Sequence, residues 1–281
     1  MKKTTYIIIA AVVLGGVSLS ALTAFLFDFG NSKNIHMDMT AVDVSQDNSD
    51  SEFIATELEP FSSLNFTEFR DDNVRVYFNN PLPEIKIIES DTVTTPKLIA
   101  EARWKPFLKH HVYKNEMEIW MDFRSLANKK GGRVSVSFNI DTAIVLLVPR
   151  NKIDLVKLAE PEIRYTLSKF ESKKLTIEGN SNVKFSYCTI DTIDFQDIHN
   201  RYGAYPLDWW LETTTIKNMN VTPSRLRLGT DLASAIDNLV CYGVDDTTVE
   251  LDIDNAIIRS FRWSPARESK IMLTSEQSFS F

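Results

Sequence analysis

Short pairs of apolar residues recur through the second half of the chain at a nearly constant spacing, and this recurrence limits the fold more than any other feature. One series of predicted strand starts, spaced 18, 23 and 23 residues apart, consists of Leu175, Ile193, Ile216 and Leu239. A second series, spaced 43, 23 and 22 residues apart, consists of Val183, Leu226, Val249 and Ile271. A fixed period of ~20–50 residues is typical of a solenoid, in which each coil stacks on the previous one. The alternative is a β-sandwich with evenly spaced strands.

The second series also predicts a register. Leu226, Val249 and Ile271 should stack inward on successive coils, ~4.8 Å apart. That register places the outward-facing Arg227 beside Glu250, which is a favourable cross-strand pair.

The spacing of 43 residues is close to twice the later spacings, so one member of the second series is missing. Residues 200–210, NRYGAYPLDWW, fall in this gap, and we expect them to form a loop inserted between two coils. Loops on a rigid scaffold often carry binding sites. The candidate patch for a ligand or partner therefore consists of the aromatic residues Tyr202, Tyr205, Trp209 and Trp210. The alternative is that they pack against the solenoid, because tryptophan is usually largely buried.

Residues 53–149 predict a β-rich entry region that precedes the solenoid at 150–281. Val74, Val76 and Phe78 alternate with polar residues, which is the period of a half-buried strand. Gly131-Gly132 predicts a hairpin and therefore antiparallel pairing. The one helix that we expect in the entry region covers Pro96 to Lys105 and ends at Pro106.

The N-terminus carries a long apolar segment. Residues 6–27 are uncharged and follow Lys2 and Lys3. Because ~20 apolar residues cross a bilayer as a helix, we expect a single-pass transmembrane signal anchor. The two lysines place residues 1–5 in the cytoplasm and the rest of the chain outside. The alternative is a cleaved signal peptide, which also exports the rest of the chain.

Residues 28–52 predict an acidic, disordered linker, because they contain little apolar sequence from which to build a core. The chain has a net charge of −7, and the two anchor lysines leave an exported part of −9. This charge argues against nucleic acid as a partner. Cys188 and Cys241 should lie about two coils apart, ~9–10 Å, so we expect two unpaired, buried thiols.

Several groups of polar residues are candidates for a metal or catalytic site. The neighbours His110 and His111 should point to opposite faces of a strand, so they cannot bind one metal ion together. A calcium site would need clustered oxygens. Its three candidates do not share a face, since Asp194 should point outward while Asp191 and Asp197 lie in turns.

Glu250, Asp252 and Asp254 should share the outward face of one strand. Their spacing of ~6.5–7 Å falls within the range of inverting glycosidase carboxylates, but a strand face provides no cleft around a substrate. The sequence contains no serine nucleophile elbow, glycine-rich phosphate loop or Cys-x-x-Cys motif. We therefore predict no catalytic residue, no metal site and no cofactor, and a protein that is not an enzyme.

The order of segments resembles a known family. An anchor and a polar linker are followed by FSSLNF, NVRVYFNNPLPEIKIIES, YKNEMEIWM and VSVSFNI, and then by repeated short strands that include EGNSNVKF. This pattern is similar to the auto-transporter adhesin head, or GIN-domain, family of bacterial cell-envelope proteins. The resemblance covers roughly residues 53–281. The chain departs from the family in having few glycines in its repeats.

The resemblance implies a right-handed parallel β-solenoid with an antiparallel entry region, in a Gram-negative-type envelope. The anchor would then lie in the inner membrane, with the C-terminal domain in the periplasm. The function that we expect is a non-catalytic, membrane-tethered binding or scaffolding module, related to adhesion as the family name suggests, with a protein or glycan partner.

Two alternatives stay open. One is a polysaccharide-active β-helix enzyme, which would need a groove with calcium-binding acids and a basic residue such as Arg201 nearby. It rests on fold analogy alone. The other is an envelope-stress sensor that works with a membrane partner, because five residues before the span are too few for a folded cytoplasmic domain.

Overall fold

The structure is a computed structural model that describes residues 40–42, 52–67, 75–79, 84–122, 133–137, 143–158, 163–197, 207–254 and 258–275. This part of the chain is all-β, apart from the 3-10 helix η1 (Ala102–Trp104). It contains no helix long and apolar enough to cross a membrane. The predicted anchor at 6–27 lies outside the described residues, as does most of the predicted linker. Within that linker, β1 (Thr40–Val42) pairs with β9 (Arg133–Ser137), which also pairs with β4 (Arg75–Asn79).

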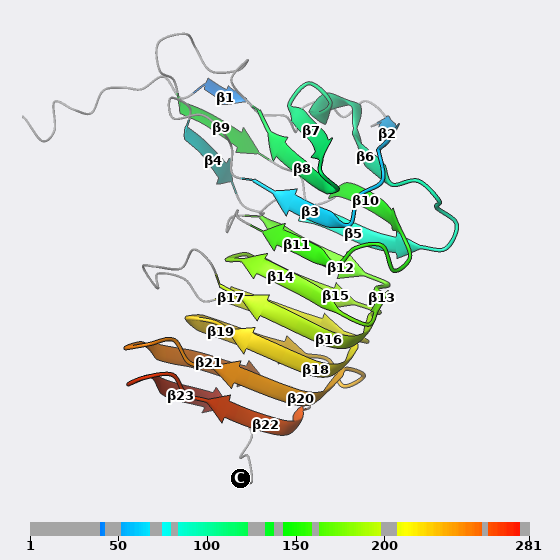
Figure 1. The fold of residues 1–281 in the computed structure, drawn as a ribbon. Helices are drawn as coiled ribbons and strands as arrows, with labels where there is room; N and C mark the ends of the chain where they lie inside the picture. The colour runs from blue at the N-terminus through cyan, green and yellow to red at the C-terminus, as the bar shows by residue number, and fades with distance from the viewer. Residues whose placement is uncertain are drawn as a thin grey trace, which may run out of the picture.

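Two long sheets run the length of the molecule, and the chain alternates between them to form a β-solenoid of about five turns (Figure 1). We call them sheet 1 and sheet 2. In spatial order, sheet 1 consists of β2 (Phe53–Glu57), β6 (Lys97–Glu101), β10 (Ala143–Pro149), β5 (Glu84–Ser90), β12 (Arg164–Ser168), β15 (Asn182–Ser186), β17 (Leu207–Glu212), β19 (Arg225–Thr230), β21 (Thr248–Asp254) and β23 (Lys270–Ser275).

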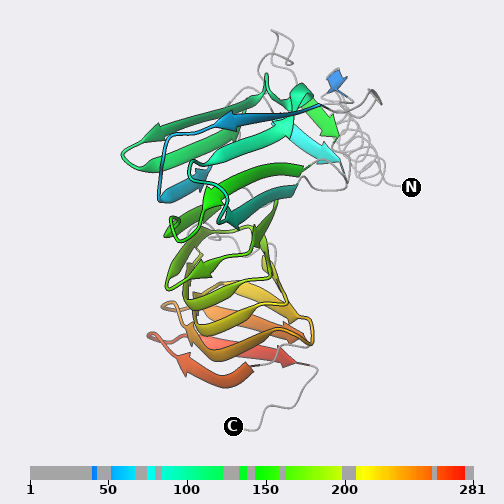
Figure 2. The same cartoon turned by 90° about the vertical axis from the view of Figure 1, so that its right-hand side faces the viewer.

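Sheet 2 consists of β22 (Ile258–Ser264), β20 (Ala235–Tyr242), β18 (Thr215–Thr222), β16 (Thr189–Gln196), β14 (Leu175–Gly179), β11 (Leu155–Leu158), β3 (Ser63–Phe66), β8 (Glu116–Met121) and β7 (Leu108–Tyr113), with β13 (Glu171–Ser172) beside β16. Figure 2 shows the coils stacked from the entry region down to β22 and β23. Alternate side chains point between the sheets and form one apolar core, as Leu207, Trp209 and Leu211 of β17 do.

The entry region combines parallel and antiparallel pairs. The hairpin predicted at Gly131-Gly132 is wrong, because β9 pairs parallel with β1 and β4 while β8 lies in sheet 2. β7 and β8 form an antiparallel hairpin through Lys114 and Asn115, which both have positive φ, as a tight hairpin turn requires. β6 pairs antiparallel with β2 and β10, whereas β3 and β5 pair parallel with solenoid strands. The predicted helix at 96–105 is wrong. Residues 97–101 form β6, because burial of Leu98 and Ala100 between two partner strands overrides helix propensity.

The predicted order of neighbouring solenoid strands is confirmed, but part of the register is wrong. Leu226 pairs with Leu251 rather than with Val249, while Val249 pairs with Ile271 as predicted. The slip is two residues, so the same side chains still face inward. It brings Arg227 beside Asp252 instead of Glu250.

The first series identifies neighbouring strands, but its members are not all aligned with one another. Ile193 pairs with Met219, and Ile216 pairs with Ile190. The reason is a break in alternation within the long strands of sheet 2: the buried residues of β16 are Ile190, Ile193 and Phe195. A strict period of two cannot be read through such a break in alternation.

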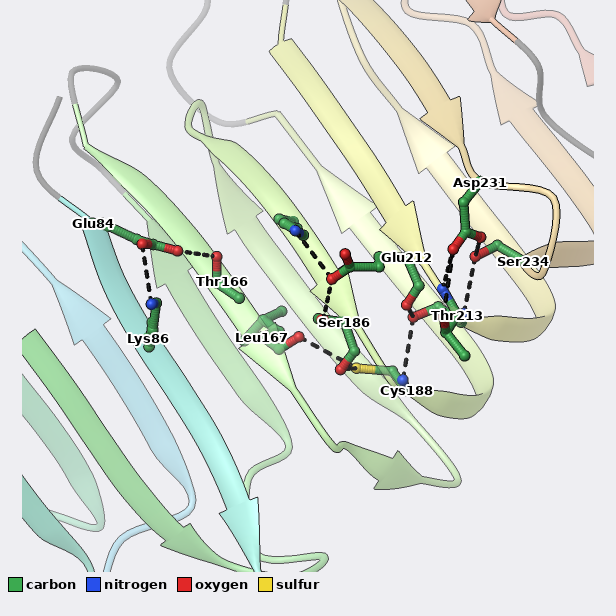
Figure 3. A network of polar contacts seen from close by, with 12 residues as sticks. Glu84, Lys86, Thr166, Leu167, Ser186, Cys188, Glu212, Thr213, Asp231 and Ser234 are labelled. Atoms are coloured by element: carbon green, nitrogen blue, oxygen red, sulfur yellow. Dashed lines mark hydrogen bonds and ion pairs between the residues drawn. The ribbon is translucent and has the colours of Figure 1, made fainter. Parts of the chain in front are cut away.

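The corner between β15 and β16 shows how successive coils are joined (Figure 3). The backbone N–H of Cys188 donates to Oγ1 of Thr214 at 3.2 Å, and the N–H of Thr214 donates to Oγ of Ser234 at 2.9 Å. All three side chains are buried. Cys188 and Cys241 are both free and buried, as predicted, and burial raises their thiol pKa values to about 11 and about 12.

Candidate binding face

The predicted aromatic patch is divided by the structure. Tyr202 and Tyr205 lie outside the described residues. Residues 207–210 are not a loop but the start of β17, which fills the position of the missing series member. Trp209 is 1% exposed, with its ring centroid 4.5 Å from that of Phe195, so it belongs to the core. Trp210 points to the opposite side of the sheet and is 42% exposed.

Trp210 leans across the sheet onto the neighbouring coil. It pairs with Gly229 of β19, and a Cβ atom at Gly229 would lie 2.5 Å from two atoms of the indole ring. The absent side chain therefore provides the space that the ring occupies. On the opposite neighbouring strand, β15, Trp210 pairs with Lys184, which forms a 3.0 Å ion pair with Glu212.

Charged side chains continue from Trp210 along the outer face of sheet 1. Arg227 lies between two carboxylates, with Asp208 at 3.6 Å and Asp252 at 3.4 Å. Beside this row, Nε of Arg225 lies 2.8 Å from Glu250. We name this surface the arginine face, and its residues are Asp208, Trp210, Arg225, Arg227, Glu250, Asp252, Met272 and Thr274.

A shallow depression of about 100 Å³ lies within the arginine face. Leu226 and Leu251 contribute to its lining although their side chains are almost fully buried, while Met272 is 50% exposed. Arg225, Arg227, Glu250 and Asp252 also line it. The depression therefore combines apolar surface with hydrogen-bond donors and acceptors.

The predicted outward direction of Glu250 and Asp252 is confirmed, since both meet outward arginines. The side chain of Asp254 lies outside the description. The two carboxylates lie on an open face and each faces an arginine, whereas glycosidase carboxylates flank a substrate from two sides. Glu250 and Asp252 therefore lack the opposed arrangement of glycosidase carboxylates.

The other polar candidates lie apart from this face. His110 and His111 belong to β7 in the entry region; burial lowers the pKa of His110, and Nδ1 of His111 lies 3.3 Å from Glu118. No group of three or more His, Cys, Asp or Glu residues in the described ranges could hold a metal ion. Arg201 falls outside those ranges.

The three aspartates considered for calcium are separated. Asp194 points outward, as predicted, and meets Lys174 and Asn220, each at 2.7 Å. Although burial alone would raise its pKa, the bonds from Lys174 and Asn220 lower the pKa overall. Asp191 lies within β16 rather than in a turn, which corrects the prediction, because the strand already begins at Thr189. Asp197 follows the strand and accepts from the N–H of Ser224 at 3.3 Å.

Sequence reasoning missed Arg225 and Met272, and it assigned Arg227 to the wrong partner. A signal was present, because Arg225-Leu226-Arg227 and Glu250-Leu251-Asp252 alternate with opposite charges on their outer positions. Aligning these two triplets directly gives the register that the structure shows.

No family model matches the chain, and no curated protein matches it. Its fold is similar to solved structures. One is a "putative adhesin" from Bacteroides fragilis, with 11% identity and a TM-score of 0.42, covering 83% of this chain and 99% of that one. Another is a "putative lipid binding protein" from Parabacteroides distasonis, with 10% identity and a TM-score of 0.38, covering 85% and 100%. Similarity this distant assigns the chain neither a family nor a function.

Proposed function

We propose that the chain is a non-catalytic, membrane-tethered binding or scaffolding module of the bacterial envelope, and that its partner binds at the arginine face. The observation that carries this proposal is an exposed tryptophan beside charged side chains held by ion pairs between neighbouring coils. These residues project from strands of one hydrogen-bonded sheet. A partner therefore meets a surface that needs little ordering on binding, which favours affinity.

Tethering, the inner-membrane location and membership of the GIN-domain family form part of the same proposal. They are supported by the apolar segment at 6–27, by the lysines before it and by the sequence resemblance. The right-handed sense of the solenoid is expected on the same basis.

Binding can be tested by cosedimentation of the detergent-solubilised full chain with envelope fragments that have been freed of membrane by detergent washing, from the bacterium that produces it. The test variant carries Trp210→Ala, Arg225→Ala and Arg227→Ala. We expect it to bind at least about tenfold more weakly than the wild type, which is ~1.4 kcal/mol of binding free energy.

The matched control carries Lys174→Ala and Arg262→Ala. Lys174 directly precedes β14 and Arg262 lies in β22, both in sheet 2, so this variant should bind like the wild type. Equal binding by both variants and the wild type would reject the arginine face as the binding surface.

Tethering has its own test. A tag added after Phe281 should be accessible to protease from the periplasm, and the tagged chain should stay with the membrane during alkaline washing. A shortened, soluble product would show that the N-terminal segment is cleaved.

A further inference from the structure

We propose that the arginine face binds an uncharged polysaccharide that lies along the solenoid axis. This inference rests on the proposed function and names its ligand class. The observations that carry it are the mixture of exposed apolar and paired charged groups, the local charge balance and the shallowness of the depression.

The first observation is the mixture of groups. A pyranose ring presents apolar C–H faces and hydroxyl groups at its edges, so it needs apolar surface beside both donors and acceptors. Trp210 and Met272 supply exposed apolar surface on β17 and β23. Between them, Arg225 and Arg227 supply fixed donors, while Glu250 and Asp252 supply acceptors.

The second observation is the charge. Every carboxylate of the arginine face lies within 3.6 Å of an arginine nitrogen. The face has two arginines for three carboxylates, in a chain whose net charge is −7. An acidic polysaccharide would meet these carboxylates, and a basic peptide would find each of them already paired. The face therefore favours a ligand with hydroxyl groups and no net charge.

The third observation is the shape. A depression of about 100 Å³ is well below the ~300–1,000 Å³ of a site that encloses a small molecule. Affinity must therefore come from weak contacts repeated over a longer ligand. From β17 to β23 the face covers three strand spacings, or ~14 Å, so several sugar units of one chain can contact it together.

A protein partner is less well matched to these residues. The centre of a protein interface is depleted of charged side chains, because it loses water on binding. A protein that covered the arginine face would bury five charged groups, and buried ion pairs often fail to recover their desolvation cost. A sugar chain leaves water beside its hydroxyl groups.

The test uses the cosedimentation assay with envelope fragments treated in two ways. Periodate cleaves the vicinal diols of sugars, whereas protease removes proteins. We expect periodate to remove most of the binding, protease to leave it, and 0.5 M salt, whose screening length is ~4 Å, to change it less than twofold. Trp210→Ala should weaken binding to protease-treated fragments at least about tenfold. Tyr187→Ala, at an exposed aromatic residue outside the arginine face, should not.

Binding that survives periodate but is lost with protease would overturn the polysaccharide ligand while leaving the proposed function intact. Strong loss in salt would show that the ligand is charged, and would also overturn the inference. If Trp210→Ala and the triple variant both bind untreated fragments normally, the proposed function itself fails. Circular dichroism of each variant checks that it is folded.

Discussion

A Cβ atom at Gly229 would lie 2.5 Å from both Cε3 and Cζ3 of Trp210, so the indole ring occupies space that any other residue would fill. Gly229→Ala should displace the ring, because the flexible side chain moves more easily than the backbone. We expect the fluorescence of Trp210 to become more accessible to acrylamide. The free energy of unfolding should change by less than ~1 kcal/mol, since alanine is favoured over glycine in a strand.

The other tryptophans also contribute fluorescence, so the assignment needs Trp210→Phe, alone and combined with Gly229→Ala. Removing Trp210 should abolish the increase. Unchanged quenching in Gly229→Ala would contradict the contact.

Gly179 should respond differently to the same substitution. It has φ of 135°, and a Cβ atom there would lie 2.0 Å from the backbone oxygen of Leu158. A backbone atom in a paired strand cannot move aside without breaking the pairing of β11 with β14. Gly179→Ala should therefore lower the free energy of unfolding by more than ~2 kcal/mol. Urea unfolding of Gly179→Ala and Gly229→Ala in parallel measures the difference in their free energies of unfolding. Equal stability of the two variants would refute this prediction.

The register of β19 and β21 can be tested with engineered disulfides. Leu226→Cys with Leu251→Cys places the thiols on directly paired residues, ~4.8 Å apart, within the usual range of Cα separations. Leu226→Cys with Val249→Cys adds two residues along the strand, for a separation of ~8 Å. Under mild oxidation, peptide mapping should detect a disulfide in the first variant alone. Efficient formation in the second would support the register that we first predicted.

The hydrogen bonds that join Cys188, Thr214 and Ser234 at the corner between β15 and β16 predict a cost for removing one hydroxyl group. Thr214→Val preserves the shape of the side chain but removes the acceptor for the N–H of Cys188 and the donor to the carbonyl of Glu212. Because Thr214 is fully buried, we expect a loss of ~1–3 kcal/mol in the free energy of unfolding. The control is the exposed neighbour Thr215. Thr215→Val should change the free energy of unfolding by less than ~0.5 kcal/mol. Similar losses in both variants would argue against a stabilising role of the Thr214 hydrogen bonds.

Glu116 predicts a pH dependence. Its hydrogen bond from Lys157 at 2.9 Å lowers its pKa below the ordinary value of 4.5, with a further bond from Asn65. The folded state therefore favours the charged carboxylate. This stabilisation is present above the unfolded pKa and is lost as the pH falls through the folded pKa.

Wild type should accordingly be more stable than Glu116→Gln near pH ~6, and the two should converge as the pH falls through the folded pKa of Glu116. Urea midpoints measured across this range provide the check. Glu268→Gln is the control, because Glu268 forms no ion pair within the part of the chain that the structure describes. A stability difference that does not vary with pH would contradict the role of Glu116.

The sequence by itself determined the all-β class, the order of the solenoid strands and the burial of Cys188 and Cys241. These follow from local information. Alternating apolar residues identify strands, and a period near 22 residues makes each strand the neighbour of the one a coil later. Side chains such as Asp194, Glu250 and Asp252 could be placed on the outer face from parity alone.

Only the tertiary structure decided the register between β19 and β21, the strand conformation of residues 97–101, and the burial of Trp209 but not of Trp210. A slip of two residues leaves inward positions inward, so hydrophobic pattern cannot distinguish Val249 from Leu251 as the partner of Leu226. β6 is a strand because β2 and β10 lie on either side of it. The adjacent tryptophans differ because β17 is a regular strand, which turns one ring onto Phe195 and the other onto the space above Gly229. The arginine face arises in the same way, since its charges come from strands that pair only once the chain has coiled.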